Sequence, residues 1–74
     1  MIILSKEKDV MVNLENVDAI GFTTKEHKTI TAHLVSGSSA ELGTYATPER
    51  AREVFDNLFN SIGYSLFEMP QDIE

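Results

Sequence analysis

The chain is 74 residues long, which allows one domain with one hydrophobic core, and it contains no cysteine. The lack of cysteine excludes disulfide bonds and thiolate metal sites and favours a reducing compartment, so we expect a cytoplasmic protein. Six basic and twelve acidic residues give a formal net charge of −6. This charge repels phosphate backbones and anionic lipid heads, and it argues against nucleic acid or a membrane surface as the main partner.

The apolar start of the chain is short. Residues 1–4 are apolar, but Ser5 and the charged residues 6–9 follow. A signal peptide requires an apolar stretch of about 7–15 residues and a membrane span roughly 20, so neither is expected. Residues 2–4 are instead interpreted as a short strand, with residues 10–14 as its hairpin partner.

The middle of the chain is rich in valine, isoleucine, threonine and phenylalanine, which favour strands. We expect strands at 17–24, 29–36 and 40–45. A loop of residues 25–27 in the first of these hairpins would pair Phe22 with Ile30 and Ile20 with Ala32.

The second hairpin is interpreted with residues 37–39 as its loop. That loop would place Leu34 opposite Leu42 and Ala32 opposite Thr44, which brings apolar residues together. The predicted inner face of the sheet then consists of Ile20, Phe22, Ile30, Ala32, Leu34 and Leu42. The opposite face, low and almost uncharged, would present Val17, Ala19, Gly21, Thr31, His33, Val35, Gly43 and Tyr45.

An amphipathic helix follows these strands. Its apolar stripe repeats at helical spacing and consists of Ala51, Val54, Phe55, Leu58, Phe59 and Ile62. Thr47 is a suitable N-cap, Pro48 suits the first helical position, and Gly63 suits a left-handed residue after the helix. We expect Phe55, Leu58, Phe59 and Ile62 to be almost fully buried.

A last strand is predicted over residues 64–69, ended by Pro70. The expected fold is α+β and two-layered, an antiparallel β-meander packed on one amphipathic helix, in the order β-β-β-β-β-α-β. Residues 1–70 would form the single domain, and residues 71–74 an acidic tail.

No motif in the sequence predicts catalysis, a cofactor or a metal site. His27 falls in a charged turn, and the neighbours predicted for His33 across the strands are alanine and glycine, so His33 is expected to pack over Gly43. The serines form neither a nucleophile elbow nor a phosphate loop. Glu49, Glu53 and Asp56 form an acidic ridge on the helix, where Arg52 is spaced to pair with Asp56.

The segment Thr44–Phe59, TYATPERAREVFDNLF, follows Leu42-Gly43, and the chain starts MIIL. With these features it resembles a family of small uncharacterised proteins from low-GC Gram-positive bacteria and their phages or mobile elements. The family shares a Y-x-(S/T)-x-E-R-A junction between strand and helix. The resemblance implies a compact α+β domain of unknown function in a bacterial setting, with no catalytic residues to transfer.

Three hypotheses about function remain at this point. The first is a non-enzymatic protein-interaction module that self-associates, as a homodimer, through the predicted outer sheet face. The second is an acidic inhibitor or mimic that uses the ridge of Glu49, Glu53 and Asp56 against a basic surface. The third is a small enzyme or a small-ligand binder, which would need a pocket that no sequence motif indicates.

Overall fold

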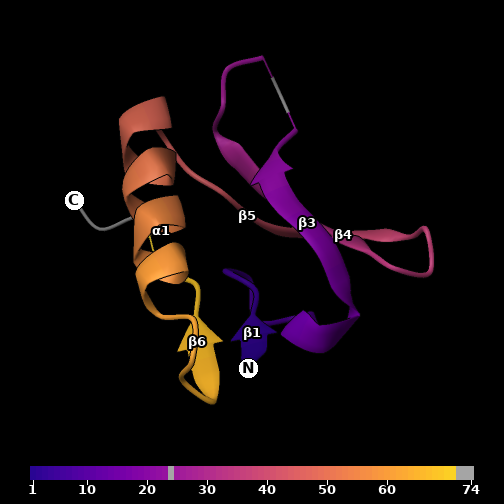
Figure 1. Ribbon diagram of the computed structural model, residues 1–74. Helices are drawn as coiled ribbons and strands as arrows, with labels where there is room; N and C mark the ends of the chain where they lie inside the picture. Colours follow the sequence, from indigo (N-terminus) through magenta and orange to yellow (C-terminus); the bar gives the residue numbers. More distant parts are fainter. Residues whose placement is uncertain (24, 72–74) are drawn as a thin grey trace.

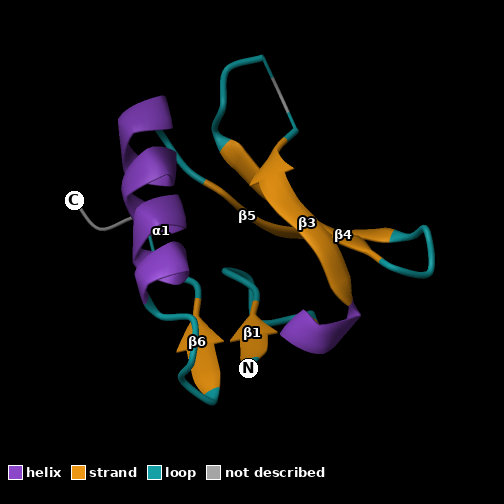
Figure 2. Ribbon diagram, in the orientation of Figure 1, coloured by secondary structure: helices purple, strands orange, loops and turns teal. Residues whose placement is uncertain are grey.

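The computed structural model of the protein describes residues 1–23 and 25–71. Its elements are β1 (Ile2–Leu4), β2 (Met11–Asn13), the 3₁₀ helix η1 (Leu14–Asn16), β3 (Val17–Phe22), β4 (Thr29–Leu34), β5 (Ser39–Thr44), α1 (Pro48–Asn60) and β6 (Leu66–Glu68). The α+β class and the order of strands around one α-helix are as predicted (Figure 2). No helix in the described ranges is long and apolar enough to cross a membrane.

The strands form two sheets of three strands, where one meander was predicted. β3, β4 and β5 form an antiparallel meander, while β1 lies between β2 and β6. β6 runs parallel to β1, so that Ile3 lies beside Val12 on one side and Phe67 on the other. Figure 1 shows β1 and β6 at the end of the molecule where α1 finishes. The last strand therefore returns to the first one, and does not extend the meander.

The β3–β4 hairpin has the predicted register: Phe22 pairs with Ile30 and Ile20 with Ala32. The pairing is interrupted by a bulge between Val17 and Ala19. Strict alternation would have turned the carboxylate of Asp18 towards the core beside Ile20, and a buried unpaired charge is costly. The bulge instead places Val17 opposite Leu34, on the inner face. The prediction of Val17 on the outer face was therefore wrong.

The predicted β4–β5 register was also wrong. Ala32 lies opposite Ala40 and His33 opposite Ser39, and a second bulge follows between Ile30 and Thr31. The loop is residues 35–37, because the Leu34 amide donates to the Ser38 carbonyl and the Gly37 amide to the Leu34 carbonyl (2.8 and 2.9 Å). Gly37 has φ +98°. A three-residue loop of this kind needs a left-handed residue in its last position, and glycine adopts that conformation without strain.

The start of α1 is as predicted. Pro48 is its first residue, and the Thr47 side chain accepts a hydrogen bond from the Arg50 amide (3.1 Å). The helix ends at the cap residue Ser61, and Gly63 has φ +113°, two residues after the cap. Ala51, Val54 and Leu58 are buried in one core with inner-face residues of both sheets. α1 thus packs on the inner face, as the two-layer prediction required.

The loop between β1 and β2 joins the two sheets by crossing β5. The Lys6 amide donates to the Leu42 carbonyl (2.7 Å), and a Cβ on Gly43 would lie only 3.0 Å from the Lys6 Cβ. Tyr45, the residue after β5, is buried, and its hydroxyl donates to the Pro70 carbonyl (2.7 Å). These contacts hold the small β2–β1–β6 sheet against the end of the meander.

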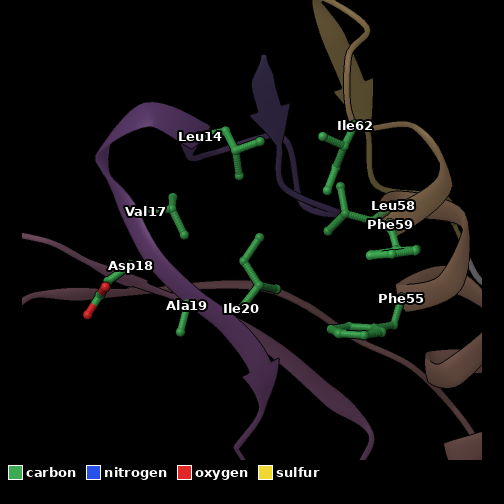
Figure 3. Close-up of a pocket in the computed structure, with 9 residues that line it drawn as sticks. All are labelled: Leu14, Val17, Asp18, Ala19, Ile20, Phe55, Leu58, Phe59 and Ile62. Carbon is green, nitrogen blue, oxygen red and sulfur yellow. The ribbon is translucent and has the colours of Figure 1, made fainter.

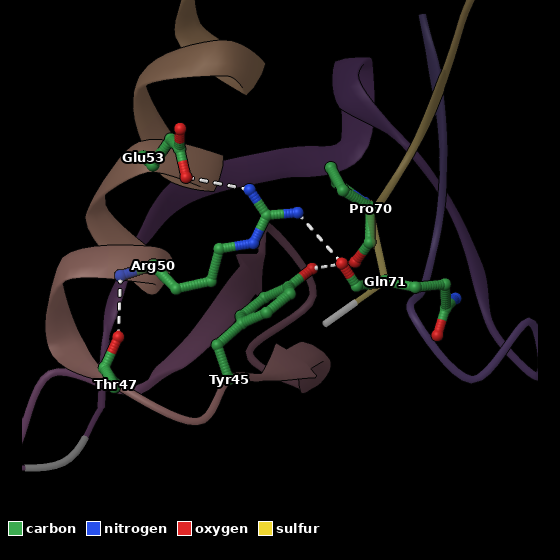
Figure 4. Close-up of polar contacts among 6 residues, drawn as sticks. All are labelled: Tyr45, Thr47, Arg50, Glu53, Pro70 and Gln71. Carbon is green, nitrogen blue, oxygen red and sulfur yellow. Dashed lines mark hydrogen bonds and ion pairs between the residues drawn. The ribbon is translucent and has the colours of Figure 1, made fainter. Parts of the chain in front are cut away.

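Gln71 is held by two hydrogen bonds, although it was expected to belong to the acidic tail of residues 71–74. Its carbonyl accepts from the Arg50 guanidinium (2.9 Å), and its side-chain amide donates to the Lys6 carbonyl (2.8 Å). Figure 4 shows how Arg50 and Tyr45 converge on Pro70 and Gln71. The remainder of the predicted tail, residues 72–74, lies outside the described residues.

Candidate functional site

The main site candidate is an apolar groove between β3 and α1. Leu14 of η1 and the β3 residues Val17–Ile20 form one wall, and Phe55, Leu58, Phe59 and Ile62 form the other. In Figure 3 the side chains of Leu14, Val17 and Ile20 point towards those of the helix, while Asp18 points away. The groove has a volume of about 250 Å³, and Asp18 is the one charged residue among the described residues that line it. We call it the α1–β3 groove.

The helical wall of the groove exists because the apolar stripe of α1 is wider than the surface that covers it. Ala51, Val54 and Leu58 face the core, and Phe55 is half-buried against the ring of Phe22 (5.2 Å between centroids). Phe59 and Ile62, however, are 69% and 56% exposed. The prediction that Phe55, Phe59 and Ile62 are almost fully buried was therefore wrong, whereas that for Leu58 is confirmed.

Further apolar exposure continues past the end of α1. Tyr64 and Leu66 are both at least half exposed. They lie on the short connection from α1 to β6 and at the start of β6, directly after Ile62. The exposed apolar surface of the described residues is thus concentrated at one end of the helix, with Met11 and Val35 as the other large exposed side chains.

The predicted outer sheet face exists only in part. Ala19, Gly21, Thr31 and His33 do share one face, since Ala19 pairs with His33 and Gly21 with Thr31. Val35 belongs to the turn after β4, and Gly43 pairs with Ile30 across the second bulge. Tyr45 is 2% exposed beneath the β1–β2 loop. Because Gly43 pairs with the inner-face residue Ile30 and Tyr45 belongs to the buried core, both lie on the inner side, and their prediction on the outer face was wrong.

The remaining part of this outer face is polar, and its hydroxyl groups form hydrogen bonds with one another. The hydroxyls of Thr23 and Thr31 lie 3.1 Å apart, and those of Thr29 and Thr44 lie 3.0 Å apart. Thr44 also donates to a Glu41 carboxylate oxygen (2.8 Å). His33 is exposed opposite Ser39, so its predicted packing over Gly43 is wrong. Thr29 and Thr31 are themselves buried, and hydroxyls that bond one another in this way offer few groups to a partner.

The acidic ridge lies on the exposed side of α1, as predicted. Arg52 pairs with Asp56 (3.3 Å), and Arg50 pairs with Glu53 (2.8 Å). Two of the three ridge carboxylates are thus paired within the helix itself. This intramolecular pairing lowers the charge that the ridge presents to a basic partner.

A second depression, of about 470 Å³, lies by Phe22, His27 and Arg52 at the N-terminal end of α1, where His27 is exposed with φ +58°. Within residues 1–23 and 25–71, no group of three or more histidine, aspartate or glutamate side chains is arranged to hold a metal ion. The described residues of this depression do not bring a nucleophile, a base and an acid together.

One sequence signal for the groove was missed. The inward alternation that sets Ile20 and Phe22 against the core also assigns Asp18 to the core, which is a conflict that a bulge resolves. The same bulge brings Val17 beside Ile20 in the groove wall.

No protein-family model, curated protein or solved structure matches the chain. The resemblance of the Thr44–Phe59 segment therefore stays a prediction.

Proposed function

We propose that this protein is a small non-enzymatic interaction module that self-associates through the α1–β3 groove and the exposed side chains beside it. The observation that carries the proposal is the exposure of Phe59 and Ile62 next to a groove whose described lining residues are all uncharged except Asp18. Uncovered apolar surface of this kind on a small domain marks an interaction site.

A second copy of the chain is a suitable partner because the same surface on both copies can form the contact. A two-fold contact requires only one self-complementary patch. Among the described residues that line the groove, only Asp18 is charged, so each copy would bring a single carboxylate to the contact. Most of the net charge of −6 arises after residue 40, where the chain has two arginines and seven acidic residues.

The exposed side chains of Phe59 and Ile62 would supply part of the free energy that a dimer needs. Full burial of a phenylalanine or isoleucine is worth about 1.5–3 kcal/mol, and the exposed parts of Phe59 and Ile62 from two copies would contribute on the order of 4–8 kcal/mol. Association itself costs about 4–15 kcal/mol. These four side chains offset only the lower part of that range, so a stable dimer needs further contacts.

The two alternative functions, an acidic inhibitor or mimic and a small-ligand binder, have less support. The internal ion pairs of the acidic ridge weaken its use against a basic partner. The groove is open and, at about 250 Å³, smaller than the roughly 300–1,000 Å³ of usual small-molecule pockets. A second protein surface fills an open apolar groove better than a small ligand does.

The proposal is tested by sedimentation of the wild-type protein and of Phe59→Glu over a wide range of concentration. We expect concentration-dependent association of the wild type and a monomeric Phe59→Glu, because a carboxylate in a closed apolar contact is strongly unfavourable. Val35→Glu is the matched control, since Val35 is 66% exposed but lies in the turn after β4. It should associate like the wild type.

Circular dichroism should show both variants folded, because neither side chain is buried. A wild-type protein that stays monomeric at millimolar concentration would contradict the proposal. So would a Phe59→Glu variant that associates as strongly as Val35→Glu.

A further inference from the structure

The open edge of β3 offers main-chain hydrogen-bonding groups beside the groove. β3 is the edge strand of its sheet, and within the described residues no segment pairs with it on the side away from β4. The Thr23 amide donates to the Thr29 carbonyl (3.2 Å), so Thr23, Gly21 and Ala19 bond towards β4. By the alternation of an antiparallel ladder, the N–H and C=O groups of Ile20 and Phe22 point to the open edge.

The side chains of these same two residues lie on the inner face. Ile20 and Phe22 pair with Ala32 and Ile30, which are fully buried there. A strand added at this edge would continue the inner face with its own apolar side chains. Those side chains would enter the space lined by Phe55 and Phe59, which is the α1–β3 groove. The groove and the open edge therefore fit one extended apolar segment.

From these features we infer that two copies pair β3 with β3, antiparallel and about a two-fold axis, joining two three-stranded sheets into one of six strands. This rests on the proposed self-association and specifies its geometry. An axis perpendicular to the sheet leaves both inner faces on the same side. Both α1 helices then lie on one face of the joined sheet, and Ile20 and Phe22 of each copy fill the groove of the other.

The charges at the two ends of β3 agree with this antiparallel arrangement. Asp18 lies near the start of the strand and Lys25 shortly after its end. Antiparallel pairing brings Asp18 of each copy near Lys25 of the other copy. It also keeps the two Asp18 carboxylates apart, because they lie towards opposite ends of the paired segment. Unlike charges across paired strands favour the pairing, whereas like charges directly opposite disfavour it.

Hydrogen exchange distinguishes this geometry from other dimers. Amide exchange is followed by NMR below and above the concentration at which the wild type associates in sedimentation. We expect the amides of Ile20 and Phe22 to slow by about tenfold or more on association. The amides of Ala19 and Gly21 are the internal control, because they bond towards β4 in either state.

Cross-linking tests the same pairing with covalent evidence, since the chain contains no cysteine. A Cβ on Gly21 would meet nothing within 4 Å, so Gly21→Cys should fold. If residue 21 lies opposite residue 21 of the other copy, the two form a non-hydrogen-bonded pair, whose Cα separation of about 4.5 Å suits a disulfide. If the pairing is shifted so that residue 21 lies opposite residue 19, the double variant Ala19→Cys, Gly21→Cys would form the link.

Mild oxidation should convert one of these variants largely to a covalent dimer, while Val35→Cys, at an exposed turn position, should remain mainly monomeric. Association without protection of Ile20 and Phe22, and without a disulfide in either variant, would overturn the β3 pairing and leave self-association standing. A protein that never associates would overturn both.

Discussion

At the scale of single residues, Tyr45 contacts three separate parts of the chain. Its hydroxyl donates to the Pro70 carbonyl, and the Arg50 guanidinium lies 6.0 Å from its ring centroid (Figure 4). The Lys6 ammonium lies 4.5 Å from the same centroid. The ring also closes over Gly43. A buried tyrosine of this kind stabilises through its ring and needs a partner for its hydroxyl. Tyr45 thereby fastens the C-terminal segment and the β1–β2 loop to β5.

Removal of the Tyr45 hydroxyl should therefore destabilise the fold measurably. We expect Tyr45→Phe to lower the free energy of unfolding by about 0.5–1.5 kcal/mol, the net value of one hydrogen bond. The measurement is urea denaturation followed by circular dichroism. Tyr64→Phe makes the same chemical change at a residue that is 69% exposed, and it should leave the midpoint unchanged. Equal midpoints for the two variants would show that the bond to Pro70 contributes nothing.

At the scale of elements, α1 divides its apolar stripe between two tasks. Ala51, Val54 and Leu58 close the core, whereas Phe59 and Ile62 face outwards beside the groove. Leu58 and Phe59 are neighbours in sequence, yet one is 3% and the other 69% exposed. The first should govern stability and the second association, because only the first loses packing when truncated.

Alanine substitution at these two positions tests that division. Leu58→Ala should lower the free energy of unfolding by about 2–5 kcal/mol, which is a large part of the stability of so small a domain. Phe59→Ala should change it by less than about 0.5 kcal/mol when both are measured below the association concentration. Thermal or urea denaturation at low concentration checks both values. A larger loss for Phe59→Ala than for Leu58→Ala would mean that α1 is rotated from its described position.

At the scale of the whole molecule, net charge and apolar surface act against each other. Each copy carries −6, so two copies repel at long range, while the groove proposed to join them has Asp18 as the one charged residue among its described lining residues. In the proposed pairing, Asp18 and Lys25 at the ends of β3 would add exposed ion pairs, each worth at most about 1 kcal/mol. We therefore expect the long-range repulsion to set the sign of the salt dependence.

Self-association should accordingly strengthen as salt is added. Between 0.01 M and 0.15 M ionic strength the Debye length falls from about 30 Å to about 8 Å, which screens most of the repulsion between two copies. Sedimentation across this range should show association at lower protein concentration in the higher salt. Association that weakens with salt would instead assign the contact to opposite charges, as the acidic ridge against a basic surface would require.

The sequence by itself determined the features that depend on near neighbours. The cap of Thr47, the start of α1 at Pro48, the Arg52–Asp56 pair and the β3–β4 register all follow from spacing within about ten residues. The order of the elements and the α+β class follow from the change of apolar period along the chain. Local sterics and hydrogen bonding dominate each of these choices, so little outside the segment can change them.

Only the tertiary structure decided which strands pair across the chain and which apolar side chains become buried. The return of β6 to β1 and the burial of Tyr45 depend on contacts between residues far apart in sequence. The same holds for the exposure of Phe59 and Ile62. Periodicity shows which side of a helix is apolar, but the width of that side that becomes covered depends on the sheet against which it packs. A narrow three-stranded meander covers part of the stripe of α1, and the uncovered part forms the wall of the groove.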